Sequence, residues 1–141
     1  MTHARPGRMP IRDFRSLVCW QLSNELKCEI FEFTSRDPAA RDFKFRDQIR
    51  DSSKSATRNI AEGFGRFGPA EFAQYLSWAR ASLMETRNHL IDARECRYIS
   101  DALFSRLFNL AFAALRLTTN LMRARTTPGG RRAKVPKIPT A

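Results

Sequence analysis

The sequence predicts an all-α fold, an antiparallel up-down-up-down four-helix bundle with flexible basic termini. Four long segments carry apolar residues at spacings of three and four, which is the period of one helix face. No segment alternates apolar and polar residues as a half-buried strand does. A chain of 141 residues has the length of one domain, and short connections place successive helices antiparallel. We therefore expect a flexible basic segment at 1–15, the bundle at 16–125 and a disordered basic tail at 126–141.

The first two predicted helices span about residues 16–34 and 42–62. Ser16 is a suitable N-cap for the first, and the pair Asp37-Pro38 ends it. The apolar face of the first helix comprises Val18, Leu22, Leu26, Ile30 and Phe33. The inner face of the second comprises Phe45, Ile49, Ser52, Ser53, Ala56 and Ile60. Because the middle of this second face is small, we expect a neighbouring helix backbone to approach it closely.

The third and fourth predicted helices span about residues 69–96 and 100–125. Gly68 and Pro69 suit the start of the third helix, and Ser100 suits the N-cap of the fourth. The stripe of the third helix comprises Phe72, Leu76, Ala79, Leu83, Thr86, Leu90 and Ala93, flanked by Tyr75 and Trp78, which we expect to be packed. The fourth helix carries two adjacent stripes: Leu103, Leu107, Leu110, Ala114, Leu117 and Leu121, and beside them Phe104, Phe108, Phe112, Leu115 and Met122. We expect this wide face to serve both internal packing and a subunit interface.

The chain is strongly basic, with 25 Lys and Arg against 14 Asp and Glu and a formal net charge of +11. About two thirds of that charge lies in the two predicted terminal segments. The tail contributes Arg131, Arg132, Lys134 and Lys137 and no acidic residue. Such termini attract polyanions without reading their sequence, and the alternative is that they only aid solubility.

The second predicted helix carries cations at every fourth position, namely Arg46, Arg50, Lys54 and Arg58, which we call the basic ridge. Three interpretations are open: a solvated face paired with nearby aspartates, a phosphate-binding surface, or interchain ion pairs. The candidate nucleic-acid-binding set consists of the basic ridge, Arg66, Arg123, Arg125 and the four tail cations. Glu62 lies where the helix dipole disfavours an anion, so we interpret Asn59 and Glu62 as polar groups that tie this helix end into the bundle.

The motifs of known catalytic centres are missing from the sequence. There is no phosphate-binding or dinucleotide-binding glycine loop, no zinc-deaminase signature and no Glu-x-x-His pair for a di-iron site. The cysteines at 19, 28 and 96 are too few and too widely spaced for a disulfide framework or a zinc site, and His89 has no second histidine near it. We therefore predict no catalytic residues, no metal and no cofactor.

The longest apolar run, residues 110–115, is far shorter than the roughly 20 residues that span a bilayer. The first ten residues contain arginines without an apolar segment behind them, unlike a secretory signal. We therefore expect a cytoplasmic protein with reduced thiols and no membrane contact.

Residues 48–66, QIRDSSKSATRNIAEGFGR, carry a recognisable pattern, whose strongest part is Asn59-Ile60-Ala61-Glu62-Gly63 followed by Gly65-Arg66. The pattern resembles the 23S ribosomal RNA intervening-sequence protein family, which also takes in the accessory variability determinant of diversity-generating retroelements. Asn59, Glu62, Gly63 and Gly65 are the structural signature. The chain departs from the family at Asp51, where a second arginine is usual, and at Ala81, where glycine is usual.

The resemblance implies a homopentamer of four-helix bundles around a central channel. In the retroelement branch it implies nucleic-acid binding and a reverse-transcriptase partner. Two functions therefore compete: a non-enzymatic oligomer that binds nucleic acid, RNA above all, through electrostatic contacts, and an oligomeric protein-interaction scaffold whose nucleic-acid affinity is incidental.

Overall fold

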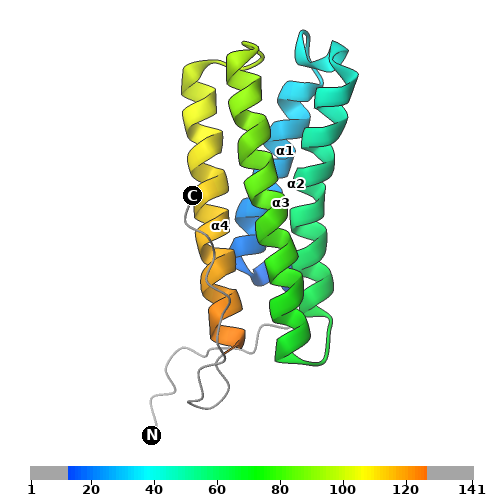
Figure 1. Cartoon of the computed structure of the whole chain (residues 1–141), viewed down its shortest axis with the longest axis vertical. Helices are drawn as coiled ribbons and strands as arrows, with labels where there is room; N and C mark the ends of the chain where they lie inside the picture. Colours follow the sequence, from blue (N-terminus) through cyan, green and yellow to red (C-terminus); the bar gives the residue numbers. More distant parts are fainter. Residues whose placement is uncertain (1–12, 127–141) are drawn as a thin grey trace, which may run out of the picture.

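Four antiparallel helices lie side by side in the computed structural model, which describes residues 13–126 (Figure 1). They are α1 (Val18–Thr34), α2 (Phe43–Phe64), α3 (Pro69–Glu95) and α4 (Asp101–Arg125), with two short 3-10 helices, η1 (Phe14–Ser16) and η2 (Ala39–Arg41), before α1 and α2. Each long helix packs on its two neighbours in the cyclic order α1, α2, α3, α4. The predicted up-down-up-down bundle is therefore confirmed, whereas 1–12 and 127–141 lie outside the described residues.

The helix starts follow local capping chemistry at three of the four long helices. The Asp42 carboxylate accepts a hydrogen bond from the Phe45 N–H at 3.2 Å, and the Ser100 hydroxyl accepts one from the Leu103 N–H at 3.1 Å. Gly68 stands at the N-cap of α3 with Pro69 in its first turn. The side chains of Asp42 and Ser100 satisfy N–H groups that have no partner inside the helix, whereas Gly68 makes no such side-chain bond.

The prediction that Ser16 caps the first helix is wrong. Ser16 belongs to η1, and α1 begins at Val18 after Leu17, whose side chain makes no capping hydrogen bond. Asp13 caps η1 by accepting a hydrogen bond from the Arg15 N–H at 2.8 Å. Because this earlier carboxylate starts a 3-10 turn, ordered structure extends into the segment that we expected to be flexible.

The core follows the predicted stripes of α2 and α3, all of whose members are buried. On α4 the buried residues come from both predicted stripes and from the positions between them, Ala111 and Thr118. The fully buried side chains there are Leu107, Ala111, Ala114 and Thr118. Phe112, at the outer edge, is 51% exposed.

Helices α2 and α3 approach each other closely, as the small side chains of α2 predict. Ser52 Oγ lies 2.8 Å from Thr86 Oγ1, and Ser82 donates a hydrogen bond to Ser55 Oγ at 2.9 Å. These hydroxyls satisfy one another inside the bundle. At the end of α2, a Cβ on Gly63 would lie 2.6 Å from Tyr75 Cβ, a distance too short for any side chain.

None of the helices described between residues 13 and 126 is long and apolar enough to cross a membrane.

Candidate nucleic-acid interface

Arg50, in the middle of the basic ridge, is bound to the end of α1. Its Nε donates to Thr34 Oγ1 at 2.8 Å, and its Nη2 lies 3.2 Å from Ser35 Oγ and 3.4 Å from the Phe31 carbonyl oxygen. The guanidinium also stacks over the Phe31 ring, 4.6 Å from its centroid. The last turn of a helix has carbonyls without intrahelical partners, so a cation is favourable there. Arg50 therefore connects α2 to α1.

The other three ridge residues divide into one held cation and two exposed ones. Arg46 pairs with Asp47 Oδ1 at 2.9 Å and lies 5.0 Å from the centroid of the Phe43 ring. Lys54 and Arg58 are exposed. The ridge is thus not a continuous row of available cations, because its first half is held by the protein itself.

The signature residues at the end of α2 behave differently from one another. Asn59 donates to the Ser55 carbonyl oxygen at 2.9 Å and to Ser55 Oγ at 3.1 Å, both in its own helix. Glu62 is exposed, and its carboxylate has no hydrogen-bond or ion-pair partner among residues 13–126. Ser55 Oγ also accepts a hydrogen bond from Ser82 of α3, so Asn59 is linked to that helix through Ser55, whereas a tie by Glu62 stays a prediction. Gly65 takes the C-cap position and donates its N–H to carbonyls of the last turn.

Arg66 and Arg125 come together at the same end of the bundle. Arg66 Nη2 donates to Tyr75 Oη at 2.6 Å, and the Arg125 guanidinium lies over the Phe72 ring at 5.4 Å. Both side chains line one surface pocket with Phe64 and Phe67. Arg123 is also exposed, near the end of α4, whereas the tail cations Arg131, Arg132, Lys134 and Lys137 lie outside the described residues.

A second row of cations, which sequence reasoning missed, runs along α3 beside α4. Arg80, Arg87 and Arg94 are spaced by seven residues, so they lie on one face of the helix, and we call them the arginine row. The Arg87 guanidinium lies over the Phe108 ring at 4.1 Å and over the Phe112 ring at 5.4 Å. The spacing of seven beside an apolar stripe was the signal that could have revealed this row.

The two ends of the arginine row are held by α4 without any carboxylate. The Arg94 guanidinium lies over the Phe104 ring at 4.2 Å, and that ring stacks on Phe108 with centroids 4.9 Å apart. Arg80 Nε donates to Thr119 Oγ1 at 2.6 Å. Burial, with a smaller effect of the nearby Arg123 charge, lowers the pKa of Arg80, although a guanidinium stays protonated in proteins.

The arginine–carboxylate ion pairs of the described residues lie away from the arginine row. Within residues 13–126, each arginine–carboxylate pair uses a carboxylate from the stretch 13–47, on or before the first part of α2. No carboxylate in that range lies within 4.0 Å of the arginine row, and Arg87 Nε is buried without a hydrogen-bond partner there. None of the three arginines therefore forms an ion pair with a carboxylate of the described residues, although Asp101 lies near Arg94.

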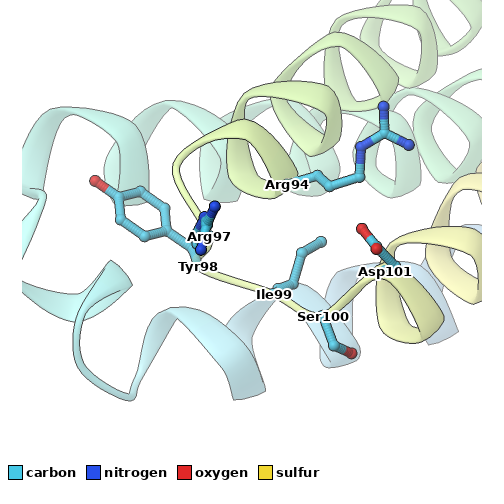
Figure 2. A pocket seen from close by; sticks show the side chains of 6 residues that line it. All are labelled: Arg94, Arg97, Tyr98, Ile99, Ser100 and Asp101. Atoms are coloured by element: carbon cyan, nitrogen blue, oxygen red, sulfur yellow. The ribbon is translucent and has the colours of Figure 1, made fainter.

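The α3–α4 connection closes one end of this face. Figure 2 shows Arg94 and Asp101 on one side of a pocket, with the Tyr98 ring pointing away from them. The Tyr98 hydroxyl donates to Asp42 Oδ2 at 2.6 Å. This hydrogen bond raises the pKa of Tyr98 to about 12, and the same bond, with the Phe45 N–H, lowers the pKa of Asp42. The pair fixes the connection to the start of α2.

The histidine and cysteine side chains between residues 13 and 126 form no site with one another. No group of three or more potential metal ligands occurs among the described residues. His89 Nε2 lies 3.4 Å from Glu85 Oε1 on its own helix. Cys19 is buried, which raises the pKa of its thiol, and Cys28 and Cys96 are exposed.

Comparison with known proteins addresses the fold and the family. No curated protein matches the chain. A solved structure, that of a protein of unknown function from the S23 ribosomal protein family of Bacteroides thetaiotaomicron VPI-5482, is similar with a TM-score of 0.69 and 22% identity. The similarity covers 74% of this chain and 95% of that one, and it supports the bundle fold. The model of the 23S rRNA-intervening sequence protein family matches residues 15–120, so the chain belongs to that family.

Proposed function

We propose that this protein is a non-enzymatic RNA-binding protein that contacts phosphates with the arginine row on α3. The observation that carries the proposal is that Arg80, Arg87 and Arg94 form no ion pair with a carboxylate in the described part of the chain, although five other arginines there do. A guanidinium without a protein anion retains its charge and donors for an external one. The family's name links its members to 23S rRNA, and for this reason RNA is the polyanion that we name.

The mechanism is electrostatic. Each arginine that neutralises a phosphate releases condensed counterions, so affinity falls steeply as salt rises. Helix α4 adds Arg116 and Arg123, which lie four and eleven residues after Phe112 and therefore on the same side of the helix as that ring. Because contacts to phosphates carry no base information, the protein selects RNA for charge and shape rather than for sequence.

Self-association is the second part of the proposal. Two large apolar side chains of α3, Trp78 and Met84, are each 48% exposed. Large apolar side chains at the surface are commonly covered by a partner. We propose a homo-oligomer, for which the family resemblance implies five subunits. An accessory role beside a reverse transcriptase stays a prediction of that resemblance.

The interaction-scaffold function has one observation in its favour. Tyr75 and Trp78 form an edge-to-face pair at 4.9 Å on α3, where the Trp78 ring was expected to be packed but is half exposed. Aromatic residues of this kind are enriched at protein interfaces. In that function Trp78 would contact a protein, and the arginine row would be dispensable.

The test is a titration of a fluorescein-labelled RNA hairpin, followed by anisotropy from about 50 to about 500 mM salt. One variant replaces Arg80, Arg87 and Arg94 with Gln. The matched control replaces Arg36, Arg41 and Arg106 with Gln. It removes the same amount of positive charge, but these three arginines already pair with carboxylates. Light scattering of each protein reports the oligomeric state.

We expect the arginine-row variant to bind RNA at least about tenfold more weakly, with a log–log salt slope shallower by about two to three. The control variant should change affinity by less than about threefold, because its arginines are already neutralised. Equal losses in the two variants, or a wild-type protein that ignores RNA at the lowest salt, would contradict the proposal. In the second case the scaffold function would take its place.

A further inference from the structure

We infer that the face between α3 and α4 binds a single-stranded segment of RNA, with an unpaired base stacked on the Phe112 ring and the Arg87 guanidinium. The inference rests on the proposed RNA binding and adds the class of RNA and the residues that recognise it. Two independent features carry it: an exposed flat surface, and hydrogen-bond donors without acceptors.

The flat surface is the end of a column of planar groups. Arg94 stacks on Phe104, Phe104 stacks on Phe108, and Arg87 covers Phe108 and reaches Phe112. The column stops at Phe112, which is 51% exposed although its neighbour Phe108 is half-buried. Nucleobases stack on aromatic rings and on guanidinium planes, and such stacking does not depend on base identity.

The unused donors belong to Arg87. None of its N–H groups has a hydrogen-bond acceptor among residues 13–126, and its Nε is buried. Two phenylalanine rings therefore hold the guanidinium in place, and these rings accept no conventional hydrogen bond from it. A phosphate or a base edge that approaches Phe112 would meet the ring and the outer Nη groups of the guanidinium, whereas the buried Nε only adds to the cost of leaving Arg87 without an acceptor.

The dimensions and the charge fit a short single strand. Arg80 and Arg94 are fourteen residues apart, which corresponds to about 21 Å along a helix and thus to a few nucleotides. In a duplex the bases are already stacked on one another, so an exposed ring on a helix surface gains nothing from them. Only an unpaired base can use the Phe112 ring, whereas the arginine row attracts both forms.

The test compares an oligoadenylate of about twelve nucleotides with the same strand hybridised to its complement. The decisive variant is Phe112→Ala. The matched control is Phe43→Ala. It also removes an exposed phenylalanine that lies beneath an arginine, in this case Arg46 of the basic ridge. Arg87→Lys keeps the positive charge but removes the planar group. Both replaced rings are exposed, and thermal melts verify that each variant is folded.

We expect Phe112→Ala and Arg87→Lys each to weaken binding of the single strand by about tenfold, and binding of the duplex by less than about twofold. Phe43→Ala should leave both affinities unchanged. If wild-type protein binds neither oligonucleotide, the proposed function fails and the inference fails with it. If it binds both and Phe112→Ala behaves like Phe43→Ala, only the stacking inference is overturned. A change of oligomeric state in Phe112→Ala would also overturn it, because the face would then be an interface between copies.

Discussion

Arg50 on α2 and Arg87 on α3 are two arginines in similar aromatic surroundings with different roles. Each guanidinium stacks on a phenylalanine ring, at 4.6 Å for Arg50 and 4.1 Å for Arg87. Arg50 also has three oxygen acceptors on and just after the last turn of α1, whereas Arg87 has none among residues 13–126. The difference shows that stacking fixes the position of an arginine. The acceptors around it decide whether its N–H donors are already paired within the fold or remain available to another molecule.

The cause lies in what each arginine faces. Helix α1 ends at Thr34, next to Arg50, and a helix end presents carbonyls and hydroxyls that need donors. Arg87 faces the middle of α4, where all backbone carbonyls are already paired within the helix and the side chains are phenylalanines. One arginine therefore completes a helix terminus, and the other covers an apolar surface.

Replacement of Arg50 by alanine gives the largest expected effect on stability. The variant loses hydrogen bonds from a charged donor to the end of α1, so we expect the free energy of unfolding to fall by about 2 kcal/mol. Urea denaturation monitored by circular dichroism measures it. Lys54→Ala, an exposed cation one turn further along α2, is the control and should change stability by less than about 0.5 kcal/mol. If the two variants were equally stable, the contacts of Arg50 would have no structural value.

Replacement of Arg87 by methionine should have a smaller effect of the opposite sign. Methionine keeps the apolar stem over Phe108 and removes a buried Nε without a partner. We expect the variant to be as stable as the wild type or more stable by about 0.5 kcal/mol, while its affinity for RNA falls. The same denaturation experiment tests this. A clear loss of stability would place Arg87 beside Arg50 as a structural residue and end the contrast.

The hydrogen bond between Tyr98 and Asp42 joins the α3–α4 connection to the start of α2. Of the three interactions, we expect it to contribute least to the free energy of unfolding at neutral pH. The pKa of Tyr98 is raised to about 12 in the folded protein, so the contribution of the pair is complete below about pH 10, the pKa of a free tyrosine, and is lost as pH rises through 12. The pKa of Asp42 is lowered, so the contribution is present above about pH 4 and is lost as pH falls through the folded value.

The stability difference between wild type and Tyr98→Phe should consequently be constant between about pH 5 and 9 and shrink toward both extremes. Unfolding in urea at about pH 7 and about pH 11 measures the difference. A difference that stayed the same at the higher pH would mean that the phenolic hydrogen bond contributes nothing.

Much of the fold was predictable from the sequence, because the determining interactions are local. The capping residues Asp42 and Ser100 accept hydrogen bonds from N–H groups three positions further along the chain. The Gly68-Pro69 pair has the backbone preferences of a helix start, and α3 begins there. The stripes of α2 and α3 mark the buried faces, since only one side of each helix can face the core. The error at Ser16 arose where a second capping residue, Asp13, precedes it and competes for the same chain segment.

The candidate interface was predictable only in part. Sequence reasoning alone showed that the chain is basic, that four helices form, and that cations recur along α2 at a spacing of four. It could not show which cations remain available, because a guanidinium reaches across to the neighbouring helix and helix packing sets what it meets there. Arg50 meets the polar end of α1, and Arg87 meets the phenylalanines of α4. The spacing of residues along one helix contains no information about the surface of the next.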